Sequence, residues 1–377
     1  MSKVKLGEVA IEHKETCKGS KDGYPIVGLE HLVPEEVTLT AWDEGSDNTF
    51  TKMFRKGNVL FGRRRAYLKK AAVAPFDGIC SGDITVIEAI SDRILPELLP
   101  FIIQNDDLFD FAVGKSAGSL SPRVKWEHLK NYEFELPDMD KQCELAELLW
   151  AMDATKKSYQ KLIAATDELV KSQFMEQFGS YLGDETRCAT VEQVCTVFAD
   201  GDWIESKDQA DDGIRLIQTG NVGNGVYLDK GERARYIDEE TFIRLNCTEV
   251  LPNDILISRL PDPVGRACII PDGLGKSITA VDCSIVRLKS HVLPEFFVAY
   301  TMTTLYAAQI GSSVTGSTRK RISRKNLGQV VIPTPDIDQQ EQFAAFVRQS
   351  DKSKFELEQA LSELTATYKR IITENLG

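Results

Sequence analysis

The 377-residue sequence has few histidines, no closely paired cysteines and no long apolar run. Its eight cysteines include no C-x-x-C pair and its four histidines stand singly, so we expect no zinc site. The apolar runs fall far short of the ~20 residues that span a bilayer, and residues 1–15 carry charge where a signal peptide needs an apolar stretch. These absences predict a cytoplasmic protein that crosses no membrane, with its cysteines buried as small apolar side chains.

Sequence signatures of catalysis are also missing. The triplets that start at Gly114 and Gly275 resemble the end of a phosphate-binding loop, but Phe109 and Ile270 occupy the position of its first glycine. The sequence has no glycine-rich nucleotide turn, no N-P-P-Y loop and no nuclease carboxylate–lysine set. The aspartates of 200–212 lack the glycine and glutamate spacing of a calcium loop, which indicates exposed loop acids. We therefore expect no active site in this chain.

An internal repeat organises the sequence, whose length already suggests two or three domains. Several features recur at an offset of 198 positions: Gly118-Ser119 with Gly316-Ser317, Pro137 to Gln142 with Pro335 to Gln340, and Gly179 with Gly377. Upstream the offset between the copies changes: Asn58 to Arg63 matches Asp254 to Arg259 at an offset of 196. Each copy thus has a variable front and a rigidly spaced back of about 40 residues. This pattern indicates two recognition modules on one scaffold.

The two backs predict long helices with a coiled-coil seam. Apolar residues follow 3-4 spacing in both, and prolines at 137 and 335 end whatever precedes. At 1.5 Å per residue each helix would be roughly 57–60 Å long. The predicted seam residues are Leu145, Leu149, Met152, Ile163 and Val170 in the first helix, and Phe343, Val347, Leu357, Leu361, Leu364 and Tyr368 in the second.

The alternative for each back is a solitary amphipathic helix that lies on its own domain. Two seams of equal register in one chain favour packing of the helices on each other. Antiparallel packing is favoured because the second front must leave the end of the first helix and return at the start of the second, and domain termini usually lie close together.

The two fronts read as mixed domains. Short β-branched runs such as Ile84–Ile87 and Ile255–Ile257 indicate strands, and helical stretches intervene near 95–112 and 293–310. The predicted fold class is therefore α+β, with two pseudo-repeated mixed α/β domains separated by two long antiparallel helices that form a coiled coil.

Positive charge is concentrated although the net charge is −12. Between Lys52 and Lys70 lie eight cations and no acid, interleaved with Phe54, Phe61 and Tyr67. A second acid-free cluster spans residues 316–325. One basic run is usually a solvated face, but two runs at corresponding parts of a repeat favour nucleic acid.

With its halves aligned, the sequence resembles the specificity subunit of type I restriction-modification systems. The residues that carry the likeness are Asp254 to Arg259, Gly316 through Ile322 to Leu327, Ile332 to Pro335, and Gln340, with weaker versions in the first copy. The likeness covers the whole chain. One departure is that the family usually has Glu-Gln where this chain has Lys141-Gln142 and Gln339-Gln340.

The resemblance implies target recognition domains at 1–138 and 180–335, and conserved spacer helices at 139–179 and 336–377. Each domain would read one half of a bipartite site in double-stranded DNA, and a rod of roughly 57 Å could separate them by more than a DNA turn of about 34 Å. Two modification subunits with S-adenosylmethionine would methylate adenine, and a restriction subunit with ATP and Mg would translocate and cleave. This chain would hold no cofactor.

We predict DNA contacts, most to phosphates and a few to bases, from ten cations: Arg63, Arg64, Arg65, Lys69 and Lys70 in the first domain, and Arg259, Arg319, Lys320, Arg321 and Arg324 in the second. A second hypothesis is a cytoplasmic coiled-coil scaffold that joins protein partners without DNA. A third, a self-contained restriction-methylation enzyme, is disfavoured by the missing cofactor motifs.

Overall fold

The structure is a computed structural model that describes residues 2–45, 48–316 and 319–377. The chain divides into two compact units. Unit 1 comprises Met1–Lys161 and Glu358–Gly377, and unit 2 comprises Leu162–Leu357. Each unit therefore contains one of the predicted fronts together with a part of each long helix.

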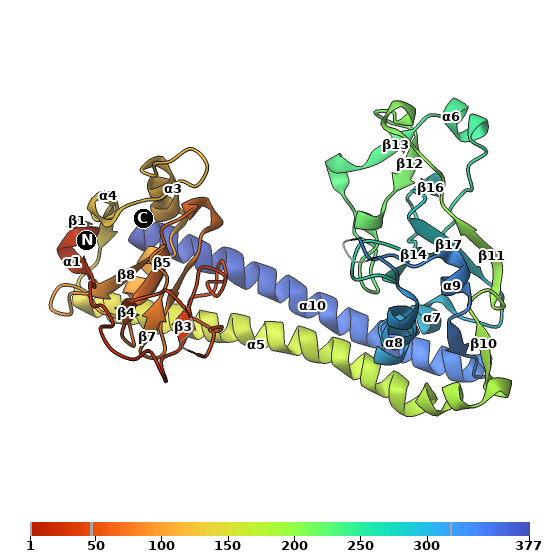
Figure 1. The fold of residues 1–377 in the computed structure, drawn as a ribbon, viewed down its shortest axis with the longest axis horizontal. Coiled ribbons are helices and arrows are strands. Elements are labelled where there is room, and N and C mark those ends of the chain that lie inside the picture. Colours follow the sequence, from red (N-terminus) through yellow and green to blue (C-terminus); the bar gives the residue numbers. More distant parts are fainter. Residues whose placement is uncertain (1, 46–47, 317–318) are drawn as a thin grey trace. The chain divides into compact units, whose positions relative to one another are not determined.

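The core of unit 1 is a four-stranded antiparallel sheet in the order β2-β8-β5-β6, of which Figure 1 labels the two central strands, β8 and β5. Its strands are β2 (Ala10–Glu12), β8 (Ile84–Ala89), β5 (Val59–Gly62) and β6 (Ala71–Val73). Two smaller sheets pair β3 (Ile26–Val27) with β7 (Gly78–Cys80) and β4 (Lys52–Phe54), and β1 (Ser2–Lys5) with β9 (Glu133–Leu136). The short helices are α1 (Leu6–Val9), η1 (Ala66–Leu68), α2 (Leu99–Ile103), α3 (Asp106–Gly114) and α4 (Trp126–Leu129).

Unit 2 repeats this plan, with a four-stranded sheet in the order β11-β17-β14-β15. Its strands are β11 (Cys195–Asp200), β17 (Cys283–Leu288), β14 (Ile255–Ser258) and β15 (Ala267–Ile269). The smaller sheets are β13 (Arg235–Ile237), β12 (Ile214–Ile217) and β16 (Ser277–Thr279), and the pair β10 (Cys188–Thr190) and β18 (Val331–Pro333). The short helices are α6 (Glu239–Arg244), α7 (Pro294–Thr301), α8 (Thr304–Ser313), α9 (Arg324–Gly328), η2 (Gly179–Gly183), η3 (Glu185–Arg187), η4 (Ser206–Asp208), η5 (Thr219–Asn221) and η6 (Gly231–Arg233).

The mixed helix and strand class is thus confirmed. Each helical stretch predicted near 95–112 and 293–310 is in fact two helices, α2 with α3 and α7 with α8. The break is a side-chain cap: Asn105 accepts a hydrogen bond from the backbone N–H of Asp107, and Thr303 accepts one from Tyr306. The two capping residues lie 198 positions apart, so the repeat extends to this detail.

The long helices are α5 (Met139–Phe178) and α10 (Ile337–Leu376), close to their predicted bounds. Asp138 caps α5 by accepting a hydrogen bond from the backbone N–H of Lys141 at 3.0 Å. Within the described residues, no helix combines the length and the apolar character needed to span a bilayer.

Inside each unit the two long helices run antiparallel. In unit 1, Leu145 and Leu149 near the start of α5 share a core with Ile372 and Leu376 at the end of α10. In unit 2, Phe174 and Phe178 near the end of α5 pack on Phe343 near the start of α10 with ring centroids 5.4 and 5.6 Å apart. In both stretches the helices also join the core of the domain, so they are not solitary helices.

The eleven predicted seam residues are all buried or half-buried. The large apolar side chains of the long helices that the seam omitted and the fold buries are Phe174, Phe178, Ile372 and Leu376. Together with Val170 and Tyr368 they recur every four residues, whereas the seam alternates three and four. A four-residue step moves the apolar stripe around the helix, so that near its ends it faces the domain core as well as the partner helix.

Adjacent leucines on α5 test the helix packing. Leu149 is 0% exposed and Leu148 is 45% exposed. We expect Leu149→Ala to lower the free energy of unfolding by about 2–5 kcal/mol, because it leaves a cavity in the core of unit 1. Leu148→Ala, the control on the same turn, is expected to cost less than about 1 kcal/mol. Urea unfolding of both variants checks this, and equal costs would contradict the packing.

A buried glutamine joins each long helix to its domain. In unit 1 the Gln142 side chain accepts a hydrogen bond from the backbone N–H of Leu95 at 2.8 Å and donates one to the carbonyl of Pro137 at 2.9 Å. In unit 2 Gln340 accepts from Leu293 at 2.9 Å and donates to Pro335 at 2.8 Å. The amide therefore fixes the start of the helix against the segment that leads into the preceding helices.

Loss of the second amide should be costly. Gln340→Ala leaves the N–H of Leu293 and the carbonyls of His291 and Pro335 without the side chain they bond. We expect the free energy of unfolding to fall by about 2–4 kcal/mol. Gln342→Ala, an exposed position on the same helix, should change it by less than about 0.5 kcal/mol. Comparable urea midpoints for the two variants would refute a linking role for the amide.

Candidate nucleic-acid interface

The same backbone corner is built twice, and it brings together cations that are distant in sequence. In unit 1 the N–H of Arg63, just after β5, bonds to the carbonyl of Asp83, and the N–H of Val124 bonds to the carbonyl of Arg63, both at 3.0 Å. In unit 2 Arg259, just after β14, bonds to Asp282 at 2.9 Å, and Ile322 bonds to Arg259 at 3.2 Å. Each corner thus joins the end of a central strand to a later loop.

That later loop is a tight hairpin in both units. Ala117 and Arg123 exchange two backbone hydrogen bonds of 3.0 Å, and Thr315 and Arg321 exchange two of 2.9 Å. The glycine of the repeated Gly-Ser has a positive φ in each hairpin, +119° at Gly118 and +94° at Gly316. A Cβ at Gly316 would lie 2.5 Å from the carbonyl oxygen of Arg319, so the turn requires glycine. Ser317 and Thr318, also part of the predicted repeat, lie outside the described residues.

In unit 1 the corner holds a carboxylate between two guanidinium groups. Arg123 contacts Asp83 through Nε at 2.7 Å and Nη2 at 3.2 Å, and Arg64 Nη1 lies 3.5 Å from the same carboxylate. The hydrogen bonds from Arg123 hold the pKa of Asp83 below its ordinary value and raise the pKa of Arg123. Both arginines are therefore oriented and remain partly exposed, as a phosphate-binding surface requires.

The rest of the first cation cluster surrounds the short helix η1. Arg65 and Lys69 flank it with positive φ angles of 54° and 51°, a backbone conformation that is uncommon outside glycine and often found at functional sites. Arg65 is exposed, and within the described part of the chain no acidic side chain pairs with it. Lys69 contacts Asp106 at 2.6 Å, and Lys70 donates to the carbonyl of Leu29 at 2.7 Å.

Of the three aromatic residues interleaved with this run, Phe54 and Phe61 are fully buried. Tyr67, on η1, is 55% exposed. Tyr67 is therefore the aromatic ring of the run that the fold leaves at the surface, between Arg65 and Lys69.

In unit 2 four of the five predicted cations lie at the surface. Arg319, Lys320, Arg321 and Arg324 are exposed. Arg319 lies 3.7 Å from Asp282 and Lys320 lies 3.4 Å from Asp262. Arg324 donates a hydrogen bond to the carbonyl of Phe198 at 2.9 Å. Arg259 differs, because its side chain is 6% exposed and lies 3.4 Å from Asp200. This position suits an internal ion pair, and we do not include Arg259 in the surface.

The sequence interpretation omitted Arg123, which stands apart from the basic run. Arg321 was among the predicted residues, and Arg123 lies 198 positions before it. Alignment of the two copies would therefore have identified Arg123. Asp83, the carboxylate that both arginines share, had no comparable signal in the sequence.

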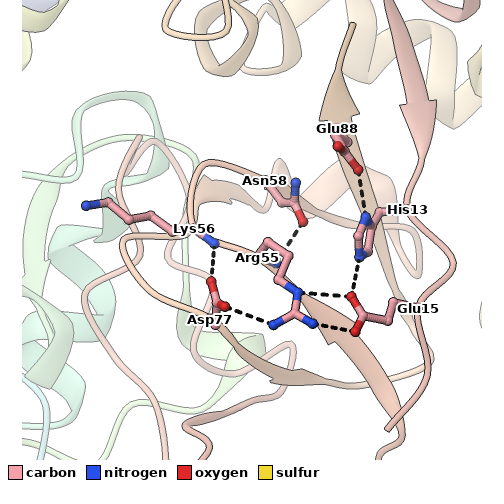
Figure 2. Close-up of polar contacts among 7 residues, drawn as sticks. All are labelled: His13, Glu15, Arg55, Lys56, Asn58, Asp77 and Glu88. Atoms are coloured by element: carbon pink, nitrogen blue, oxygen red, sulfur yellow. Dashed lines mark hydrogen bonds and ion pairs between the residues drawn. The ribbon is translucent and has the colours of Figure 1, made fainter. Parts of the chain in front are cut away.

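The first half of the basic run lies in a different network. Figure 2 shows Arg55 between the carboxylates of Glu15 and Asp77, while the backbone N–H of Lys56 bonds to Asp77 and the Lys56 side chain points away. His13 extends the chain of contacts, bonding Glu88 at 2.7 Å and Glu15 at 3.2 Å. The hydrogen bond from Arg55 lowers the pKa of Glu15. These charges neutralise one another, so this network is a poor site for a polyanion.

One group of side chains has the composition of a metal site. Glu30, His31 and Asp43 lie within reach of a common ion. However, Nδ1 of His31 accepts a hydrogen bond from the backbone N–H of Gly28 at 2.9 Å, which places the ring proton on Nε2, 3.5 Å from Asp43. A protonated nitrogen cannot ligate a metal, so we assign no metal here.

The fold and its two corners define a class of protein: two copies of a mixed domain, each joined to a long helix and each with a hairpin that meets a strand end at a corner where arginines gather. The family described as type I restriction modification DNA specificity domain matches this chain twice, at residues 1–165 and 186–365. The chain belongs to this family.

A curated relative is the type I restriction enzyme EcoDI specificity subunit of Escherichia coli, which is 25% identical over 183 residues, 48% of this chain and 37% of the relative. The match thus spans about a third of that relative's length. Two solved structures share the fold. One, concerning complex assembly and conformational transition of the type I R-M system, has a TM-score of 0.62 at 20% identity and covers 99% of this chain and 97% of its own. The other, a type I restriction-modification S subunit from M. genitalium, has a TM-score of 0.52 at 11% identity and covers 100% and 96%.

The Asp83 contact predicts a pH-dependent contribution to stability. Asp83→Asn removes a charged acceptor, and we expect the free energy of unfolding at pH 7 to fall by about 1 kcal/mol, since both arginines are partly exposed. Because the folded pKa of Asp83 is lowered, the stabilisation is complete above the ordinary carboxyl pKa of about 4 and is lost as the pH falls through the lowered value.

Urea unfolding of both proteins between pH 7 and pH 3 measures this difference. The gap between the wild type and Asp83→Asn should close towards pH 3. Asp92→Asn serves as the control, because Asp92 is largely exposed and lies 3.8 Å from its nearest cation. A gap that persists unchanged at pH 3 would argue against the ion pair as its cause.

Proposed function

We propose that this chain is the DNA-binding specificity subunit of a type I restriction-modification complex, with each unit reading one half of a bipartite site. The observation that carries the proposal is the duplicated corner, in which a hairpin meets the end of a central strand and arginines from both segments gather in both units. Membership of the DNA specificity domain family supports the nature of the ligand. The different side chains on the two hairpins fit two different half-sites.

The exposed cations of the corners would bind phosphates and fix the register of the DNA. In unit 1 these are the exposed Arg65 and the partly exposed Arg63, Arg64 and Arg123, with Lys69 and Lys70 alongside. In unit 2 they are Arg319, Lys320, Arg321 and Arg324. A net charge of −12 does not oppose this, because at physiological salt charges beyond a Debye length of about 8 Å are largely screened, and the local cations decide the binding.

The chemistry would belong to partner subunits. We propose that modification subunits, two in number, contribute S-adenosylmethionine and methylate adenine, and that a restriction subunit contributes ATP and Mg for translocation and cleavage. This chain would set the register and catalyse no step. The corresponding division places recognition domains at 1–138 and 180–335 and spacer helices at 139–179 and 336–377, in a complex that works in the cytoplasm.

Two measurements test the proposal. Mapping methylated adenines in the DNA of cells that express this chain with its modification partner should reveal one split, asymmetric sequence. The purified complex should then shift a duplex that contains this sequence in preference to a scrambled duplex. A complex that binds both duplexes weakly and equally would favour the scaffold hypothesis instead.

Within the complex, Arg64→Ala combined with Arg65→Ala should weaken binding about equally for cognate and scrambled duplexes. The slope of log affinity against log salt should become shallower by about 1 to 2, because each lost phosphate contact contributes about 0.9. Arg93→Ala is a matched control, since Asp83 precedes β8 and Arg93 follows the other end of that strand, about 20 Å away. An unchanged slope in the double variant would exclude these two arginines.

A further inference from the structure

An exposed leucine lies at the tip of the unit 1 hairpin, residues 117–123. Leu120 is 92% exposed, the highest value among the large apolar side chains of the described residues. A single exposed leucine is ordinary on a protein surface. What distinguishes Leu120 is its place, in a hairpin whose base carries Arg123 and whose neighbours across the corner are Arg64 and Arg65.

The hairpin is held at its base and on the C-terminal side of Leu120. The backbone N–H of Arg65 bonds to the carbonyl of Pro122 at 2.8 Å, and Nε of Arg64 bonds to the hydroxyl of Ser121 at 2.5 Å. The paired hydrogen bonds between Ala117 and Arg123 close its base. The tip is therefore presented in a fixed position and does not fold back onto the domain, where Leu120 could be buried.

An apolar side chain in this position gains no favourable interaction from a phosphate group. DNA offers it two apolar partners: the C5-methyl group of thymine in the major groove, and the faces of bases that have been unstacked. Unstacking costs a few kcal/mol per step, and burial of one leucine returns only about 1.5–3 kcal/mol. Contact with a methyl group requires no deformation of the duplex, so one leucine favours the methyl contact.

We propose that Leu120 is a specificity-determining residue that contacts the C5-methyl group of a thymine in the half-site read by unit 1. This inference rests on the proposed function. The flanking arginines bind phosphates and place the hairpin tip in the major groove, and Leu120 distinguishes thymine from the other bases at one position. The equivalent position of the second copy is Thr318, so the leucine contact belongs to the half-site read by unit 1.

The test uses the complete methylation complex and the duplex found by mapping. Each thymine of both half-sites is replaced in turn by uracil, which lacks the methyl group and keeps the same hydrogen bonds. We expect one replacement to weaken wild-type binding about fourfold, the factor that corresponds to burial of one methyl group. Leu120→Ala should bind more weakly than the wild type to the thymine duplex and should be indifferent to that replacement.

Leu251→Ala, which changes an exposed leucine of unit 2, is the control and should keep the wild-type response to uracil. The salt slope of Leu120→Ala should equal that of the wild type, in contrast to the arginine variant. A response to uracil that survives in Leu120→Ala overturns the proposal, as does a half-site without thymine or a wild type indifferent to every replacement.

Two further results are separable. If 2-aminopurine in the duplex brightens on binding of the wild type but not of Leu120→Ala, while no methyl effect is seen, the leucine inserts between bases and the methyl contact is wrong. If the wild-type complex shows no preference for the mapped duplex, the proposed function itself fails. In that last case alone there is no sequence-specific binding, so the arginine variant has none to weaken.

Discussion

The structure depends on a buried glutamine side-chain amide that is present once in each unit. Gln142 and Gln340 each bond backward to the residue 47 positions earlier and to a proline carbonyl five positions earlier. An insertion or deletion between the bonded residues is tolerated only if it leaves both ends in place. Otherwise the hydrogen-bonding groups would be left buried and unpaired. This constraint explains why the later part of each copy keeps a constant offset of 198 while the earlier part drifts.

In each corner only the hairpin lies between the two residues that the glutamine amide joins. The strand end of the corner comes before them in the sequence. Gly118 and Gly316 keep the common offset, whereas Arg63 and Arg259 differ in theirs by two positions. The backbone bonds between strand end and hairpin nevertheless form in both units. The frame that presents side chains is therefore preserved, and the side chains on it have diverged: a leucine with small polar neighbours in one hairpin, and Arg319 with Lys320 in the other. Such a frame allows two recognition surfaces to evolve separately.

Much of the fold could be predicted from the sequence, because repeats and periodicity report packing directly. The 3-4 spacing identified buried residues in the first part of each long helix, such as Leu149 and Phe343. It missed Phe174 and Ile372 near the C-terminal ends, because those side chains pack in the domain core as well as on the partner helix. The side-chain caps at Asn105 and Thr303 were missed because a cap inside an apolar stretch looks like a tolerated polar residue. At the corner, clustering in sequence was a poor guide: Arg259 is internal, Arg55 is neutralised, and the isolated Arg123 reaches the surface.

The carboxylates beside the arginines limit how much any one cation can add to DNA binding. A phosphate that engages Arg123 must compete with Asp83, whose lowered pKa reports how well that ion pair is already satisfied. Under the proposed function the net gain would be the difference between two charge-assisted contacts, so Arg123 would contribute orientation more than affinity. Arg65, which has no acidic partner in the described residues, would keep its full attraction for a phosphate. Affinity and register would thus come from different arginines of one corner, and sequence discrimination would come from groups that no carboxylate holds.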